Sequence, residues 1–212
     1  MFNVCPACGA YEVEKAIEPG GAAAAFAGCP RCGHRQRFLR LPLFVVTGAS
    51  GAGKSALALA LPARLPECVT LESDILWGAG FDTTEDGYAA FRGLWLRLAK
   101  NVHQAGRPVV LCGSALPEQF EGRPERRYLA AIRYLALVCD ERRLAERLRR
   151  RPAWRESGGD AFVAEMVRFN GWLGDHAART SPPMDLLDTS ELSVEEATER
   201  VAAWVRGGLD PR

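Results

Sequence analysis

An eight-residue, glycine-rich segment has the residue types and the spacing that bind a nucleotide polyphosphate. It reads Gly48-Ala49-Ser50-Gly51-Ala52-Gly53-Lys54-Ser55 and fits the pattern G-x-x-x-x-G-K-[ST] without deviation. The glycines let backbone N–H groups converge on phosphate oxygens, and the helix that follows adds the positive end of its dipole. In such a loop Lys54 reaches the β- and γ-phosphates, and the Ser55 hydroxyl binds Mg²⁺. We therefore expect a loop that holds a magnesium nucleotide.

Four of the seven cysteines form two matching pairs that have the spacing of a zinc site. Cys5 and Cys8 are separated by two residues, and so are Cys29 and Cys32, with a glycine after each pair. The full pattern, C-x2-C-x20-C-x2-C, lets four thiolates surround one tetrahedral ion. We expect a structural Zn²⁺ site, because a catalytic site leaves one coordination position open. The other thiols are expected to be small buried hydrophobes: Cys68, Cys112 and Cys139.

Alternating apolar and helical segments around the glycine-rich loop indicate an α/β fold. Residues 43–47 form an apolar run typical of a buried parallel strand, and good helix formers at residues 56–61 follow the loop. Helical patterns separate four further apolar runs, which are expected to be strands: residues 68–72, 108–112, 133–139 and 184–188. We thus predict a five-stranded parallel sheet whose ligand lies beyond the carboxyl ends of the strands.

The chain is expected to contain two domains. Residues 1–40 resemble a zinc ribbon, and about 40 residues bury too little apolar surface to fold without the metal. In this region we expect short strands at residues 11–14 and 34–39, with a flexible turn at residues 20–28 between the cysteine pairs. Residues 41–212 form the second, α/β domain.

Composition excludes several classes of protein. With 48% hydrophobic and 25% charged residues, the chain is globular rather than disordered. No apolar run approaches the roughly 18 residues of a membrane helix, and the N-terminus lacks a signal-peptide pattern, so we expect a cytoplasmic protein without a membrane partner. Charges in residues 1–40 sum to zero once zinc-bound thiolates are counted, so nucleic acid is not an expected partner. No pattern indicates an oligomeric state.

Two segments resemble the P-loop kinases of small molecules and nucleotides, a class that includes gluconate and shikimate kinases. Leu71-Glu-Ser-Asp74-Ile-Leu-Trp77 follows the second strand, where those kinases carry an Asp that faces the acceptor hydroxyl and the magnesium. Val110-Leu-Cys-Gly-Ser-Ala-Leu-Pro-Glu-Gln-Phe120 looks like the gluconate kinase segment after the third strand. The similarity spans about residues 43–206 and implies the P-loop kinase fold, with ATP and Mg²⁺ as cofactors.

The resemblance also implies a reaction, the transfer of the γ-phosphoryl group to a small hydroxylated metabolite, nucleoside or nucleotide. Asp74 would orient the acceptor hydroxyl and take its proton. Residues 141–158 would form a lid, within a stretch from 123 to 155 that holds 11 arginines and four acids. Arginines of the lid would stabilise the transferring phosphoryl group. The candidates are Arg147 and Arg151, which are four residues apart on one helix face, with Arg143 and Arg155 next.

Several alternatives stay open. Arg92, on the helix after the second strand, either holds an anionic group of the acceptor or is a surface arginine. Asp140 and Glu141 end an apolar run, as in mechanical ATPases, although Asp140 more plainly caps the next helix. One alternative is a nucleic-acid-directed kinase or ATPase that uses the arginines and the cysteine region together. Another is a nucleotide-gated regulatory switch with little turnover. A GTPase is disfavoured, because the sequence has no N-K-x-D box.

Overall fold

A computed structural model describes residues 3–77, 80, 88–152 and 157–209 of the chain. By their contacts, the residues divide into two compact units. The first unit comprises Met1–Leu43, Leu76–Val109 and Glu118–Ile132. The second unit comprises Phe44–Ile75, Val110–Pro117 and Arg133–Arg212.

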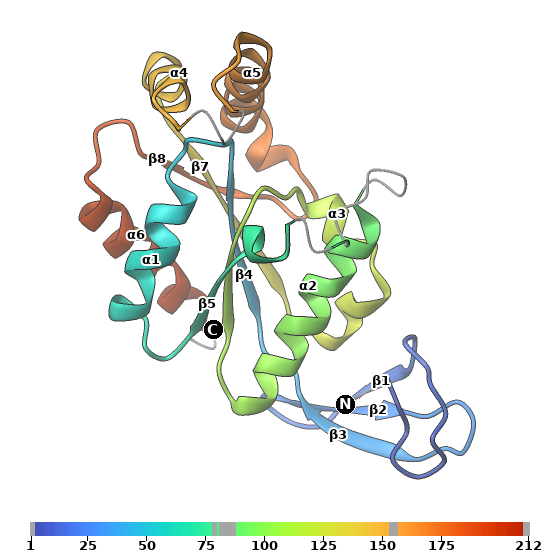
Figure 1. Ribbon diagram of the computed structural model, residues 1–212. Coiled ribbons are helices and arrows are strands. Elements are labelled where there is room, and N and C mark those ends of the chain that lie inside the picture. The colour runs from blue at the N-terminus through green and yellow to red at the C-terminus, as the bar shows by residue number, and fades with distance from the viewer. Residues whose placement is uncertain (1–2, 78–79, 81–87, 153–156, 210–212) are drawn as a thin grey trace. The chain divides into compact units, whose positions relative to one another are not determined.

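The second unit is built around a five-stranded parallel sheet with the order β5-β6-β4-β7-β8 (Figure 1). Its strands are β4 (Leu43–Gly48), β5 (Val69–Glu72), β6 (Val109–Cys112), β7 (Ile132–Val138) and β8 (Asp185–Asp188). β4 and β6 are buried along their whole length, which explains their uninterrupted apolar sequences. All five predicted strands are confirmed, each to within one residue at either end.

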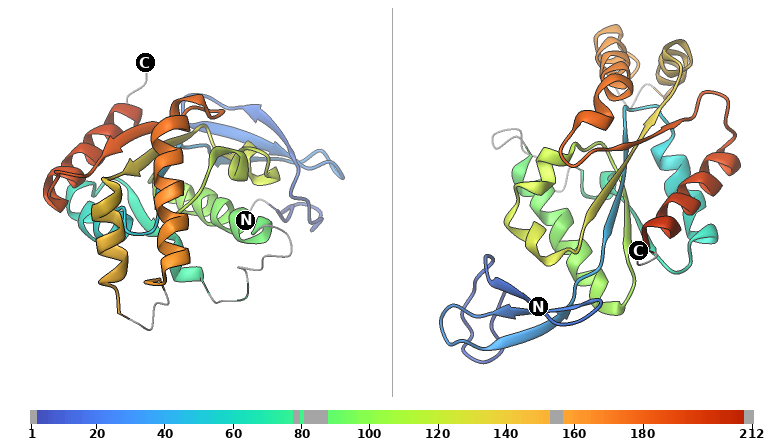
Figure 2. Two further views of the ribbon diagram at one scale, coloured as in Figure 1. Left: turned by 90° about the horizontal axis from the view of Figure 1, so that it is seen from above. Right: turned by 180° about the vertical axis from the view of Figure 1, so that it is seen from behind.

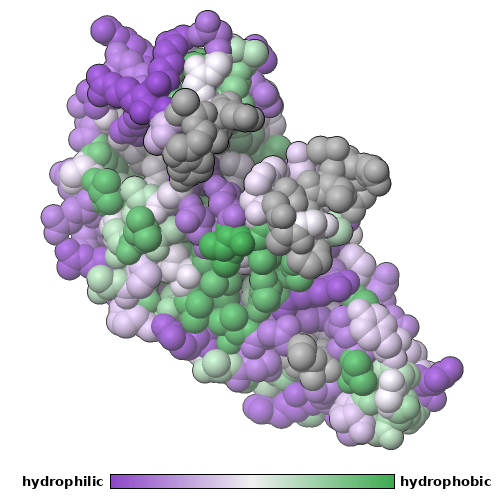
Figure 3. Space-filling model, viewed as in Figure 1, coloured by the Kyte–Doolittle hydropathy of each residue, from purple (hydrophilic) through white to green (hydrophobic). Residues whose placement is uncertain are grey.

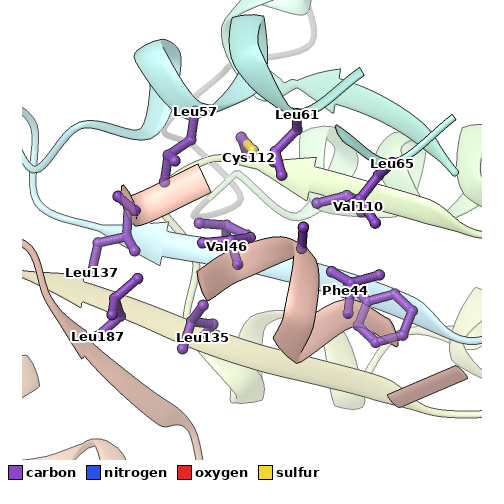
Figure 4. Packing of buried hydrophobic residues seen from close by; sticks show 14 of the residues in the cluster. Phe44, Val46, Leu57, Leu61, Leu65, Val110, Cys112, Leu135, Leu137 and Leu187 are labelled. Carbon is purple, nitrogen blue, oxygen red and sulfur yellow. The ribbon is translucent and has the colours of Figure 1, made fainter. Parts of the chain in front are cut away.

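Helices α1 (Lys54–Arg64) and α6 (Val194–Leu209) cover one face of this sheet (Figures 1 and 2). Side chains of α1 point toward the central strands and form the main apolar core (Figure 4). Labelled members of that core are Phe44, Val46, Leu57, Leu61, Leu65, Val110, Leu135, Leu137 and Leu187. Burying so many large aliphatic side chains at about 1.5–3 kcal/mol each supplies most of the drive to fold.

Two further helices, α4 (Glu141–Arg149) and α5 (Asp160–His176), pack together beyond the carboxyl end of β7 (Figure 1). The Asp140 side chain accepts the N–H of Arg143 at 2.9 Å, so its predicted role as the cap of α4 is confirmed. At α6, Ser193 and Glu196 form the reciprocal hydrogen bonds of a capping box. Among the described residues, no helix is both long and apolar enough to cross a bilayer.

The first unit contains a three-stranded antiparallel sheet and several short helical segments. Its strands are β1 (Ala16–Pro19), β2 (Ala24–Gly28) and β3 (Arg35–Leu39), with β2 in the middle. Its helical segments are α2 (Ala89–Val102), η2 (His103–Ala105), most of α3 (Pro117–Glu121), and η3 (Pro124–Tyr128). In the second unit, η1 (Ser73–Leu76) follows β5, and η5 (Ala177–Arg179) follows α5.

Two predictions for the cysteine region are wrong. Tyr11 makes only an isolated bridge to Val4, so residues 11–14 are not a strand. Residues 20–28 are not merely a flexible turn, because β2 is the central strand of the sheet. Ala25 and Ala27 of β2 are buried under Phe38, and their small side chains suit a thin core that the local sequence pattern does not reveal. The predicted strand at residues 34–39 is confirmed by β3.

Candidate active site

The glycine-rich loop joins the carboxyl end of β4 to the first turn of α1. Gly53 is the N-cap of α1 and has φ of 108°, a left-handed conformation that a glycine adopts without strain. Because the first N–H groups of a helix have no partner within it, this turn presents free donors to an anion. Gly51 has φ of 90°, and a Cβ there would lie 2.9 Å from the Leu144 side chain. The loop therefore requires glycine for its shape and for the close approach of α4.

A polar cavity of about 240 Å³ opens over this turn and brings most of the predicted site residues together. Lys54 and Ser55 come from the start of α1, Asp74 from η1, and Arg147 and Arg151 from the end of α4 and just beyond it. The cavity is also lined by Ser50, Gly51, Gly53, Ala56, Glu72, Cys112 and Gly113. Three cationic residues, two serines and two carboxylates thus line the space above the loop, and the cations and hydroxyls are groups that can bind a polyphosphate.

Lys54 lies in the floor of this cavity. Its ammonium donates to the carbonyl oxygens of Gly48 at 2.7 Å and Ala49 at 3.0 Å. Burial lowers the pKa of Lys54 to about 8, while the charge of Asp74 opposes that shift. At neutral pH the ammonium is therefore mainly charged, but it titrates much closer to neutrality than an exposed lysine.

Asp74 is held by its neighbour on η1. The Ser73 hydroxyl donates to Asp74 Oδ1 at 3.2 Å, and the Asp74 side chain is exposed to the cavity. Ser73 in turn lies against Gly113, where a Cβ would come within 2.2 Å of the Ser73 hydroxyl oxygen. The glycine after β6 therefore allows η1, and with it Asp74, to occupy this position.

Four residues of the cavity were not predicted to belong to it: Ala56, Glu72, Cys112 and Gly113. Glu72, the last residue of β5, adds a second carboxylate beside Asp74, and the strand-end rule that places Asp74 would also have found it. Cys112, the last residue of β6, is buried as expected but also lines the cavity. Burial raises the pKa of its thiol to about 12, so it contributes a neutral group there.

Helix α4 is packed directly on the glycine-rich loop. Leu144 and Leu148 are buried against Gly51, and Arg147 Nη1 donates to the Gly51 carbonyl at 3.4 Å. Met166 of α5 accepts the Ser50 N–H through its sulfur at 3.4 Å. The outer face of α4 is strongly hydrophilic (Figure 3). The helix thus aims one arginine at the loop while most of its charges face solvent.

The next two candidate arginines are Arg143 and Arg155. Arg143 donates to the Ser190 carbonyl and pairs with Glu191 at 2.7 Å, so it holds the segment after β8. Arg155 lies outside the described residues.

A second, more apolar cavity of about 300 Å³ adjoins the first. The two cavities share Gly51, Gly53, Ala56 and Arg147. The remaining lining residues are Ala52, Leu57, Thr189, Leu192, Ser193, Val194 and Ala197. Thr189 directly follows β8, at the carboxyl end of that strand. An apolar cavity beside a polyphosphate site suits the base and sugar of a nucleotide.

Arg92 belongs to α2, in the first unit. Its guanidinium lies 5.7 Å from the centroid of the Phe91 ring and 5.9 Å from that of Phe120. The buried Nε has no hydrogen-bond partner among the described residues. Burial lowers the pKa of Arg92, and the nearby charge of Arg123 lowers it further. By contrast, Arg97 on the same helix forms an ion pair with Glu125 at 2.6 Å.

The four predicted zinc ligands lie together. The Sγ atoms of Cys5 and Cys32 are 3.7 Å apart, as are those of Cys8 and Cys29, and all four lie within 4.8 Å of one another. Zinc–sulfur bonds of about 2.3 Å in a tetrahedron place the sulfurs about 3.8 Å apart. The cluster therefore has the donor set and the dimensions of a four-thiolate zinc site.

The fold and the loop together define a P-loop protein with the kinase fold. Residues 43–172 match the family model described as AAA domain, and the chain belongs to that family. No curated protein sequence matches the chain.

Solved structures of several kinases share the fold. A sugar kinase from Janibacter sp. HTCC2649 is 15% identical, with a TM-score of 0.57, over 82% of this chain and 99% of that one. A gluconokinase from Sinorhizobium meliloti 1021 is 19% identical, with a TM-score of 0.53, over 80% and 98% of the two chains. Shikimate kinase from Acinetobacter baumannii is 16% identical, with a TM-score of 0.51, over 79% and 94%. At these identities the likeness establishes the fold.

Proposed function

We propose that the protein is an ATP-dependent phosphotransferase that moves the γ-phosphoryl group to a small hydroxylated metabolite, nucleoside or nucleotide. The observation that carries this proposal is the polar cavity in which Lys54, Asp74, Arg147 and Arg151 meet above the loop. Membership of a P-loop family and the shared fold of sugar, gluconate and shikimate kinases support it.

The nucleotide would occupy the two adjoining cavities. Backbone N–H groups of residues 48–55 and the Lys54 ammonium hold the β- and γ-phosphates, and the apolar cavity takes the adenosine. Ser55 would hold Mg²⁺, which supplies charge neutralisation to the phosphates when bound. Arg147, near the end of α4, and Arg151, just beyond that helix, line the same space and stabilise the charge on the transferring group.

The acceptor would approach from the side of η1. Asp74 orients its hydroxyl group; the acceptor oxygen bonds to the γ-phosphorus as the bond to ADP breaks, and Asp74 takes the proton. Because the transition state is loose, alignment by Asp74 contributes more than base strength. Arg92, whose buried Nε has no hydrogen-bond partner among the described residues, would bind an anionic group of the acceptor.

The cysteine region would hold a structural zinc ion. Cys5, Cys8, Cys29 and Cys32 fill all four positions of the tetrahedron, so the ion offers no open position for chemistry. We propose residues 1–40 as a zinc ribbon that precedes a kinase domain of residues 41–212, in which residues from about 141 to 158 form the lid.

The decisive experiment is a screen of small hydroxylated metabolites, nucleosides and nucleotides for acceptor-dependent release of ADP from ATP. Each hit is checked by mass spectrometry for a gain of one phosphoryl group. Calorimetry with Mg²⁺–ATP on zinc-loaded protein runs alongside, and Lys54→Ala serves as the control that should lose binding. A phosphorylated product that requires Asp74 supports the proposal.

Three outcomes would contradict it. If the protein binds no magnesium nucleotide, the glycine-rich loop is not a phosphate-binding loop and the proposal is wrong. Binding without acceptor-dependent turnover by any compound supports a nucleotide-gated switch. Turnover that an oligonucleotide stimulates, with a steep dependence on salt, supports a nucleic-acid-directed enzyme.

A further inference from the structure

The zinc-binding region shares its compact unit with the helix that carries Arg92. Met1–Leu43 group with Leu76–Val109 and Glu118–Ile132, so β1, β2 and β3 belong with α2, η2 and η3. We infer that this region is the structural base of α2, and that its metal sets the affinity for the acceptor rather than for the nucleotide. The part that concerns the acceptor rests on the proposed function of Arg92.

A buried lysine joins three segments of this unit. Lys100 lies in the last turn of α2 and is 2% exposed. Its ammonium donates to Asn3 Oδ1 at 2.6 Å and lies 4.2 Å from the centroid of the Tyr128 ring. Asn3 stands two residues before Cys5, and its carbonyl accepts the N–H of Glu12 at 2.7 Å. A buried ammonium deprived of such partners is left uncompensated, so these contacts are costly to break.

Tyr128, the last residue of η3, completes the core of the three-stranded sheet. Its ring packs edge-on against Phe38 with 5.7 Å between centroids, beside Ala25 and Ala27 of β2. Its hydroxyl donates to the Val13 carbonyl at 2.6 Å. Since a region of about 40 residues has too little apolar surface for a core of its own, the cysteine region depends on η3 as well as on zinc.

Further polar contacts join the cysteine region to the helical segments of the same unit. Gln104 of η2 accepts the Leu39 N–H at 2.8 Å and donates to the Leu39 carbonyl at 3.0 Å, as a neighbouring strand would. Arg127 of η3 pairs with Glu14 at 3.0 Å. The end of β3, the loop before β1 and the N-terminal residues are therefore each tied to a different helical segment.

Helix α2 carries both Lys100, which holds this base, and Arg92, which is proposed to bind the acceptor. Arg92 lies eight residues before Lys100 on the same helix, a rise of about 12 Å. When the metal leaves, Asn3 and the strands lose their fixed places, the end of α2 loses its partners, and Arg92 moves with the helix. Every described residue that lines the polar cavity above the loop belongs to the second unit, so nucleotide affinity is expected to stay unchanged.

Hydrogen exchange on the full-length protein, zinc-loaded or treated with a chelator, tests the structural part. After zinc removal, exchange in residues 89–102 and 124–128 should rise about tenfold or more, together with that in residues 16–39. Exchange in α1 and α6 and the calorimetric Kd for Mg²⁺–ATP should not change. Metal content is measured before and after treatment, and Cys5→Ser/Cys8→Ser replaces chelation if the ion is retained.

Coupling is reciprocal, so a change in α2 should also weaken the metal site. Lys100→Met removes the ammonium but keeps the length of the side chain, and it should speed zinc release to a chelating dye about tenfold. It should also raise the KM for the acceptor about tenfold, with the Kd for ATP unchanged. Arg200→Met, the same loss of a cation at an exposed position of α6, is the control and should change neither.

Several results would overturn the inference. Loss of protection confined to residues 16–39 would show that the cysteine region unfolds without affecting α2. Loss of ATP affinity on zinc removal would show that the metal supports the whole chain. Purified protein that contains no metal would show that zinc does not hold the cysteine region in place. If no acceptor is phosphorylated, the proposed function fails, while the exchange and zinc-release measurements still decide whether the region supports α2.

Discussion

Arg147 Nη1 donates to the carbonyl oxygen of Gly51 at 3.4 Å, which joins α4 to the phosphate-binding loop. Arg147 also lines both cavities, so it stands where the polyphosphate of a nucleotide would meet the nucleoside. A guanidinium at this point, on a helix that Leu144 and Leu148 pack onto Gly51, is held before substrate binds. Such preorganisation is how a charged group stabilises a transition state without reorganisation.

Replacement of Arg147 by Ala should therefore lower kcat more than it weakens binding. We expect kcat to fall about 10³-fold, and the Kd for Mg²⁺–ATP to change less than about tenfold. Arg142→Ala is the control, because Arg142 is on the same helix, is 88% exposed, and pairs with Glu146 of that helix at 3.3 Å. Equal effects of the two variants, in steady-state kinetics, would mean that total charge matters rather than position.

Asp74→Asn should separate acceptor activation from nucleotide binding. The amide keeps the size of the side chain but cannot take a proton, so kcat should fall about 10²–10⁴-fold with little change in the Kd for ATP. Asp140→Asn should keep its turnover and lose about 1 kcal/mol of stability or less, because Asp140 caps α4. The reverse assignment, with turnover lost in Asp140→Asn, would indicate a mechanical ATPase.

Glu72 requires its own variant, because its carboxylate lines the same cavity as that of Asp74. We expect Glu72→Gln to reduce kcat about tenfold or less, since Glu72 ends β5 while Asp74 lies on the exposed η1 turn. A larger loss in Glu72→Gln than in Asp74→Asn, measured under the same conditions, would reassign the proton acceptor to Glu72.

The contact between Gly113 and Ser73 predicts a variant that damages the site without touching a charged group. A Cβ at Gly113 would lie 2.2 Å from the Ser73 hydroxyl oxygen and 2.5 Å from its Cβ. Gly113→Ala should therefore displace η1 and Asp74, lower kcat as much as about 100-fold, and cost about 1–3 kcal/mol of stability. Ser73→Gly should rescue it, and Gly174→Ala, with nothing within 4 Å, should be nearly neutral.

The lowered pKa of Lys54 predicts that nucleotide binding is coupled to the uptake of a proton. Burial lowers its pKa to about 8, and a bound polyphosphate favours the ammonium and raises that pKa again. At about pH 9 the free protein carries mostly neutral Lys54, so binding should take up nearly one proton, and affinity should fall about tenfold per pH unit above 8. Calorimetry in two buffers of different ionisation enthalpy measures this uptake. Lys54→Arg, charged throughout, should take up none.

The α/β part of the chain could be predicted from sequence because its signals are local. Strands such as β4 and β6 are continuous apolar runs, and the loop carries its own motif. Ligand sites of such sheets lie at the carboxyl ends of the strands. This rule predicts that Asp74 lies near Lys54, and both residues line the polar cavity. Glu72 and Cys112 are the last residues of β5 and β6, so the same rule places them in this cavity from sequence.

The cysteine region could not be predicted in the same way, because its packing is not local. β2 consists mainly of alanine and lacks the alternation that marks a strand. Its core is completed by Tyr128, about 100 residues further along the chain, and its N-terminal end is held by Lys100. The cysteine spacing did locate the four thiols that cluster, since two short pairs constrain geometry without any knowledge of the packing.

His103 predicts how stability depends on pH. Its side chain is fully buried in η2, and neither ring nitrogen has a hydrogen-bond partner among the described residues. Burial lowers its pKa from 6.5 to about 4. Between these values the unfolded chain binds the proton and the folded chain does not, so stability is present above pH 6.5 and is lost as the pH falls toward 4. The loss should be about 3 kcal/mol.

Replacement of His103 by Leu should remove this dependence, because leucine has a similar size and takes up no proton. Denaturant unfolding at pH 7 and pH 5 measures the free energy in each protein. Acid would also displace the proposed zinc ion from its thiolates, but that loss is common to both proteins and cancels in the difference between them. We expect the wild type to lose about 2 kcal/mol more than His103→Leu between pH 7 and pH 5. Equal losses would mean that the imidazole is protonated as readily in the folded as in the unfolded chain, and that its burial has no electrostatic cost.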